Sequence, residues 1–78
     1  MTKAKMLETL ILMYKDRYEA RRETRDILKF DTLTDKELKA FTDIYNREFT
    51  QCTMLEEVGE QLFGVNLFDM YLDTMYDV

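Results

Sequence analysis

The fold is decided by one short stretch near the middle of the chain, Leu33-Thr34-Asp35-Lys36-Glu37-Leu38. Thr34 and Glu37 have the spacing of a capping box, in which the threonine hydroxyl accepts from the Glu37 amide and the Glu37 carboxylate accepts from the Thr34 amide. Leu33 and Leu38 occupy the two positions of a hydrophobic staple. The stretch therefore predicts a helix boundary, with a new helix beginning directly after Thr34.

Apolar residues at three- and four-residue spacing predict three helices around this boundary. The first covers residues 3–28, with a buried stripe of Leu7, Leu10, Ile11, Tyr14 and Tyr18. The second begins at residue 35 and ends at Gly64, because glycine suits the left-handed conformation that closes a helix. Its apolar stripe comprises Leu38, Phe41, Tyr45, Phe49, Cys52, Leu55, Val58 and Leu62. The third is short, spans residues 67–76 and is capped by Asn66. Gly59 weakens the second helix and is the candidate position for a kink.

The length of 78 residues allows one domain, residues 1–78, and the absence of proline with only two glycines disfavours a turn-rich β protein. The sequence thus predicts an all-α bundle of two long antiparallel helices and a short C-terminal helix. Each long helix would extend about 40 Å, whereas a compact chain of this size has a radius of gyration of about 11–12 Å. Either a helix bends, or the chain is an elongated hairpin whose exposed stripe is completed by dimerisation.

The composition disfavours an enzyme. The chain has no histidine and one cysteine, which removes the usual zinc ligands and most acid–base or thiol chemistry near neutral pH. Glu56, Glu57 and Glu60 lack the turn that a calcium loop needs. Cys52 lies on an apolar stripe and is expected to be a buried, inert thiol. We expect no catalytic residue, no metal and no cofactor.

Charge is distributed unevenly along the chain, whose net charge is −5. Residues 1–29 hold eight Lys or Arg against five Asp or Glu, while residues 30–78 hold three against eleven. No Lys or Arg follows Arg47. This acidic half should repel nucleic acid and anionic lipid.

The uncompensated carboxylates are the candidate partner-binding site. Asp69, Asp73 and Asp77 recur every four residues and would form a ladder of negative charge that imitates a phosphate backbone. The alternative is a solvated helix face, but like charges at this spacing destabilise a helix, which favours a role outside stability. The predicted site comprises Glu56, Glu57, Glu60, Asp69, Asp73 and Asp77 for charge, with Tyr71, Met75 and Tyr76 as apolar anchors.

A secondary basic face is predicted on the first helix, made by Arg17, Arg21, Arg22 and Arg25. Such a ladder could grip phosphates, but acidic residues are interleaved with it. An ion-paired face, or a docking surface for the acidic half of another subunit, is favoured over direct nucleic-acid binding.

The residues 33–38, followed by Phe41 and by Thr53-Met54, resemble the central helix of the Hha/YmoA family of small helical modulators, which bind a nucleoid-associated protein. The resemblance covers about a quarter of the chain, and the family's Ala-Asp-His-Arg signature is not matched at residues 45–48. It implies a protein-binding modulator of transcriptional silencing that recognises its partner through charged residues.

Size, acidity and the missing catalytic groups together predict a small protein that binds a larger protein stoichiometrically. The expected partner has a basic nucleic-acid-binding groove, as for phage-type inhibitors of host defence nucleases (anti-CRISPR or anti-restriction) or of transcription. The alternative is a homodimeric helical adaptor of the nucleoid-modulator kind. A single cysteine and the lack of an apolar run of about 18 residues predict a cytoplasmic protein without a membrane span.

Overall fold

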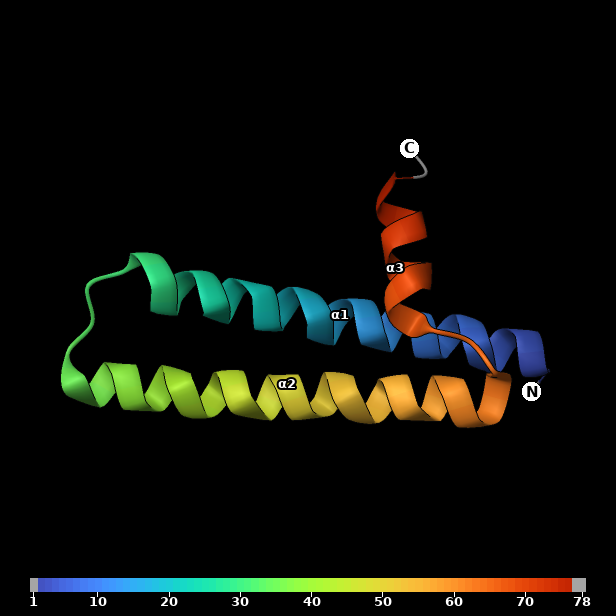
Figure 1. The fold of residues 1–78 in the computed structure, drawn as a ribbon, viewed down its shortest axis with the longest axis horizontal. Coiled ribbons are helices and arrows are strands. Elements are labelled where there is room, and N and C mark those ends of the chain that lie inside the picture. The colour runs from blue at the N-terminus through green and yellow to red at the C-terminus, as the bar shows by residue number, and fades with distance from the viewer. Residues whose placement is uncertain (1, 77–78) are drawn as a thin grey trace.

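The computed structural model describes residues 2–76 and contains three helices: α1 (Lys3–Phe30), α2 (Asp35–Phe63) and α3 (Leu67–Tyr76). Helices α1 and α2 lie side by side and antiparallel, and α3 projects steeply away from them beside the N-terminal half of α1 (Figure 1). The all-α class with two long helices and a short C-terminal helix is confirmed. Helix α1 extends two residues further than predicted.

The helix ends are held by local hydrogen bonds. The Glu37 amide donates to Thr34 Oγ1 (3.2 Å) and the Thr34 amide donates to Glu37 Oε1 (3.1 Å), so the capping box is present. These bonds to Thr34 lower the pKa of the Glu37 carboxyl. At the far end of α2, Gly64 adopts a left-handed conformation (φ 64°), and its amide donates to the Glu60 carbonyl at 2.9 Å. Asn66 Oδ1 then accepts from the Asp69 amide at 3.0 Å and starts α3.

The core is small and lies where α3 meets the hairpin. Its buried hydrophobic residues come from all three helices and are Leu10, Tyr14, Cys52, Leu67 and Tyr71. The predicted stripe of α1 is confirmed, because its other members Leu7, Ile11 and Tyr18 pack against this cluster. The predicted stripe of α2 is too wide. Of its eight residues, Cys52 is buried, but Leu38, Phe49, Val58 and Leu62 are exposed, since a single neighbouring helix cannot cover so broad an arc.

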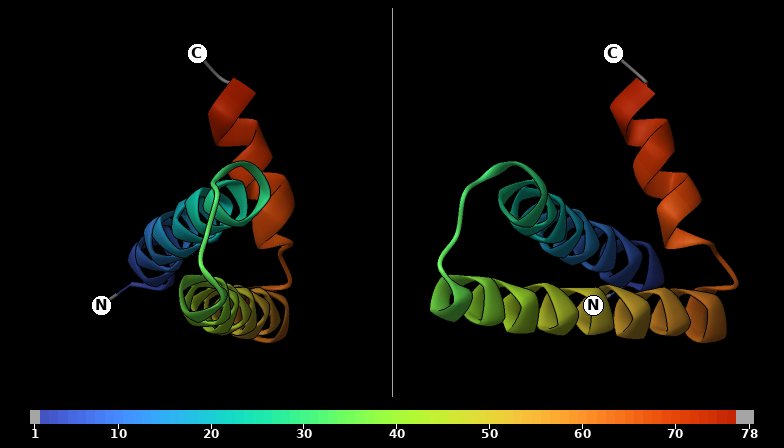
Figure 2. Two further views of the ribbon diagram at one scale, coloured as in Figure 1. Left: turned by 90° about the vertical axis from the view of Figure 1, so that its left-hand side faces the viewer. Right: turned by 60° about the vertical axis from the view of Figure 1, so that its left-hand side comes forward.

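The molecule is an elongated hairpin rather than a folded-back bundle. Its extents are 47 × 27 × 18 Å and its radius of gyration is 14.8 Å, compared with about 11–12 Å for a compact chain of this length. Figure 2 shows both long helices running unbroken for their full length, with α3 on one side of the pair. Of the two predicted alternatives, the elongated hairpin is confirmed. Within residues 2–76, no helix has the length and apolarity to cross a bilayer.

Gly59 does not kink α2, so the predicted role of this residue was wrong. Helix α2 continues through it to Phe63. Gly59 is buried, and a Cβ atom at this position would lie 2.8 Å from Leu67 Cγ. The glycine therefore allows the first residue of α3 to pack directly onto the backbone of α2.

We expect Gly59→Ala to lower the free energy of unfolding by up to about 2 kcal/mol. Alanine would gain about 1 kcal/mol of helix propensity, but overpacking against the buried Leu67 costs typically 1–3 kcal/mol. Urea unfolding followed by circular dichroism measures the difference. In a Leu67→Ala background the clash is gone, so the same glycine substitution should stabilise the protein; a destabilisation of equal size in both backgrounds would contradict the packing role.

Candidate partner-binding surface

Tyr71, predicted as an exposed anchor, belongs to the core. Its side chain is 2% exposed. Its ring centroid lies 4.7 Å from that of Tyr18 and 6.3 Å from that of Tyr14. The interpretation as a surface anchor was wrong because the apolar face of α3 that carries Tyr71 turns toward α1.

The same cluster fixes the orientation of α3. Tyr18 packs between Tyr14 and Phe68, with ring centroids 5.9 and 5.7 Å away, and these tilted contacts join two turns of α1 to α3. Leu67 anchors the first turn of α3 on α2. Polar groups on the outer side of α3 are therefore carried by a helix that is packed in place at both its first and second turns.

Glu56, predicted as a partner-binding carboxylate, is used inside the protein. Its Oε2 accepts a hydrogen bond from the Tyr14 hydroxyl at 2.9 Å, and the side chain is half-buried. Burial of the Tyr14 phenol, reinforced by the hydrogen bond and the negative charge of Glu56, raises the pKa of Tyr14 well above its ordinary value. The carboxylate satisfies the one polar atom of a tyrosine that is otherwise enclosed by apolar groups.

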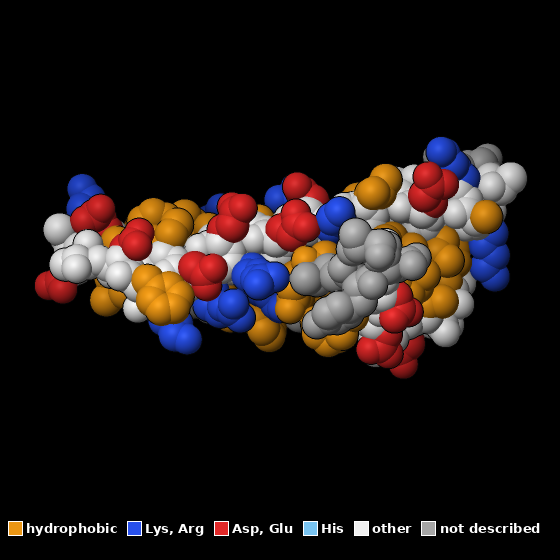
Figure 3. Space-filling view, turned by 90° about the horizontal axis from the view of Figure 1, so that it is seen from above, with side chains coloured by type: hydrophobic (Ala, Val, Ile, Leu, Met, Phe, Trp, Pro, Cys, Tyr) orange, Lys and Arg blue, Asp and Glu red, His pale blue; other side chains and the backbone are white. Residues whose placement is uncertain are grey.

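The remaining predicted carboxylates stay on the surface. Glu57, Glu60, Asp69 and Asp73 are exposed. Glu57 is two residues before Gly59, about 200° around α2 from the contact with Leu67, so it faces away from α3. We call the other three residues, Glu60, Asp69 and Asp73, the acidic corner. The three ion pairs found within the described residues all lie within α1, so none of them involves the acidic corner. Figure 3 shows a group of acidic side chains beside α3 that stands apart from the basic side chains of that face.

Glu60 also lines a cavity of about 350 Å³ at the foot of α3, together with Glu56 and the loop that joins α2 to α3. Both glutamates, one turn apart on α2, therefore face the same hollow. Of the other predicted residues, Met75 and Tyr76 lie at the end of α3 with side chains outside the description, and Asp77 lies outside the described residues.

The predicted basic face is not one surface. Arg21 lies over two rings, with its guanidinium carbon 4.6 Å from the Tyr18 centroid and 5.0 Å from the Phe49 centroid. Arg17 lines a groove between α1 and α2, and Arg25 pairs with its neighbour Asp26 at 3.6 Å. The prediction of a common face was wrong because successive turns of a straight α-helix drift around its axis, and packing gives each arginine a different environment.

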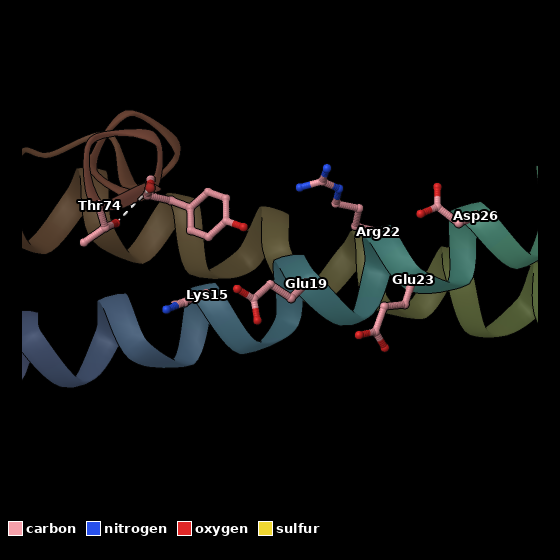
Figure 4. A pocket seen from close by; sticks show the side chains of 7 residues that line it. Lys15, Glu19, Arg22, Glu23, Asp26 and Thr74 are labelled. Atoms are coloured by element: carbon pink, nitrogen blue, oxygen red, sulfur yellow. Dashed lines mark hydrogen bonds between the residues drawn. The ribbon is translucent and has the colours of Figure 1, made fainter. Parts of the chain in front are cut away.

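Arg22 lies in a fourth environment, where it lines a cavity of about 350 Å³ beside α3. Figure 4 shows Lys15, Glu19, Arg22, Glu23 and Asp26 along the same stretch of α1, with Thr74 of α3 at one end. Two cations and three carboxylates are interleaved there. Such a mixed lining favours solvation and mutual screening rather than selection of an anion.

A second surface was not identified from the sequence. Met6 and Met13 of α1 and Met54, Val58 and Leu62 of α2 are exposed and line two adjoining hollows between the long helices. We call these five residues the apolar face. The signal that would have found it is the seven-residue spacing of Met6, Met13, Ala20 and Ile27, which is distinct from the core stripe.

Comparison with known proteins identifies no relative: no protein-family model, curated protein or solved structure matches this chain.

Replacing Arg21 with Ala should lower the free energy of unfolding by about 1–2 kcal/mol, because two cation–π contacts and the packing of the aliphatic stem are lost. Arg25→Ala is the matched control and should change stability by less than about 0.5 kcal/mol, since an exposed pair with a sequence neighbour contributes little. Chemical denaturation of both variants measures the difference. Equal effects would show that the rings do not hold Arg21.

Stability should fall as the pH rises above about 10, the ordinary phenol pKa. Burial raises the pKa of Tyr14 and, with help from Glu19, that of Tyr71, so these phenols ionise in the unfolded chain before they ionise in the folded one. The stabilisation is complete below pH 10 and is lost progressively above it. Tyr14→Phe should make the decline shallower by up to about 1.4 kcal/mol per pH unit.

The control for this alkaline effect is Tyr45→Phe, which removes a phenol from a half-buried side chain outside the core cluster. Urea unfolding at several pH values between 8 and about 11 gives the slopes for both variants. A slope that is the same for Tyr14→Phe and the parent protein would contradict the assignment.

Proposed function

We propose that this chain is a small binding protein that acts stoichiometrically, by presenting its acidic corner to a larger protein whose basic groove handles nucleic acid. The observation that carries the proposal is the state of Glu60, Asp69 and Asp73. All three are exposed without an internal counter-ion among the described residues, although basic side chains are present elsewhere in the same molecule.

The rigidity of the α3 foot supports this proposal. Leu67 and Tyr71 are buried, so Asp69 and Asp73 project from a helix that the core holds in one orientation. Fixed charges lose little conformational entropy on binding, which favours recognition by a complementary surface. The two aspartates are four residues apart and so rise by about 6 Å along α3 on one side.

The cost of this arrangement also supports a binding role. Like charges at i, i+4 destabilise a helix by a few tenths of a kcal/mol, and α3 has no basic residue in its last turn to offset them. Long-range attraction to a basic groove would speed association and depend on salt. Competition with nucleic acid for such a groove is the mode of inhibition that we propose, in the manner of a phage-encoded modulator of a host protein.

The test is a triple charge reversal, Glu60→Lys with Asp69→Lys and Asp73→Lys. The immobilised parent protein should retain nucleic-acid-binding proteins from a bacterial lysate, and duplex DNA or raised salt should release them. With a purified captured protein, the triple variant should bind about 10-fold more weakly or worse, while circular dichroism remains helical.

The matched control reverses three exposed carboxylates away from the acidic corner, Asp16→Lys with Glu23→Lys and Asp43→Lys, and so changes the net charge equally. It should bind nearly as well as the parent protein. An equal loss of affinity in both variants would show that net charge alone causes the effect. Undiminished binding by the first variant would refute the role of the acidic corner.

A further inference from the structure

The apolar face lies on the side of the hairpin that α3 does not cover. Arg22 of α1 lines the cavity beside Tyr71 and Thr74 and therefore lies on the α3 side. Met13 is nine residues from Arg22, which places it on the opposite side of α1. The five side chains of the apolar face are between 39% and 60% exposed. Met13 lines both hollows of this face, of about 290 and 180 Å³, so they form one continuous groove.

The groove has the periodicity of a helix-packing surface. On α1, Met6, Met13, Ala20 and Ile27 follow one another at intervals of seven residues, and on α2 the same interval separates Ile44, Gln51 and Val58. A seven-residue repeat keeps a stripe facing a partner helix along a left-handed supercoil. Ala20 and Ile27 of this stripe are half-buried, but Met6 and Met13 stay exposed, since α3 lies on the other side of the hairpin and no third helix among the described residues covers them.

We propose that the apolar face of one chain packs against the apolar face of a second copy, closing a four-helix bundle with α3 on each outer side. The dimensions fit this occupant. The seven-residue stripe from Met6 to Ile27 extends about 32 Å along α1. Across the roughly 20 Å width of two adjacent helices it covers about 600 Å² for each chain, the lower end of the area that a specific interface buries on each partner.

Charge selects the arrangement of the two copies. Helix α1 carries eight Lys or Arg against five Asp or Glu, net +3, whereas α2 carries three against seven, net −4. When the two-fold axis runs along the bundle, each α1 is flanked by an antiparallel α2 on both sides, one from its own chain and one from the partner. Every neighbouring pair then combines opposite net charges and opposed helix dipoles.

The polar residues of the face are compatible with this packing. Arg17 and Gln51 line the same end of the groove as Met54 and Leu55. Polar side chains at single positions of a helical interface specify its register, and the long stem of arginine can stay in the interface while its guanidinium reaches the rim. The dimer is independent of the acidic corner, so it can fail without affecting the proposed function, and the reverse also holds.

The test is the mass in solution, measured by sedimentation equilibrium over a range of micromolar concentrations. The parent protein should have twice its chain mass of 9.5 kDa. Met54→Glu with Val58→Glu should give a monomer with retained helicity, because both side chains are already exposed in the single chain. Leu12→Glu is the control, because Leu12 is 61% exposed but lines neither hollow; this variant should remain a dimer.

A monomeric parent protein would overturn the proposal, as would a dimer that survives the double substitution. A cysteine experiment tests the arrangement without depending on destabilised variants. Chains with Met6→Cys mixed with chains carrying Leu62→Cys should form a disulfide between the two copies under oxidation, since α1 of one copy adjoins α2 of the other. Cross-linking of Met6→Cys chains to one another, without the mixed product, would contradict the antiparallel α1–α2 pairing.

Discussion

The contact between Leu67 and the bare backbone at Gly59 is the constraint on which the rest of the structure depends. It allows the first residue of α3 to reach the backbone of α2. From there Tyr71 reaches Tyr14 and Tyr18, so ten residues of α3 supply two of the five buried hydrophobic side chains. Without this close approach, the hairpin of α1 and α2 would have almost no enclosed core.

Because α3 covers one side of a two-helix layer, it also determines which side stays uncovered. A pair of helices has two faces along its groove, and one short helix can fill only one of them. Tyr14 and Tyr18 of α1 pack on the α3 side, while Met6 and Met13 lie exposed on the other side. Methionine adapts to a partner surface with little loss of packing quality, which suits a face that is completed by association.

The charged residues are sorted by the same packing. Burial of Tyr14 draws Glu56 into a hydrogen bond, and two aromatic rings hold Arg21, so residues that form uniform ladders in the sequence have different roles in the fold. The carboxylates of the acidic corner are among the charged groups that remain exposed without an ion pair within residues 2–76. The charged groups available to a partner are therefore those that do not contact the core.

The sequence alone determined the helices and their ends, because caps, the staple and the left-handed glycine act between residues a few positions apart. It also determined the stripe of α1, which follows from periodicity, whereas helix length left an elongated hairpin and a bent helix as alternatives that the structure decided. Only the tertiary structure decided that Tyr71 is buried and that Gly59 contacts Leu67 instead of kinking α2. It also decided that the four arginines of α1 lie in different environments. Periodicity fixes the direction in which a side chain leaves its helix, but burial depends on which distant segment arrives there, and that is set by packing among all three helices.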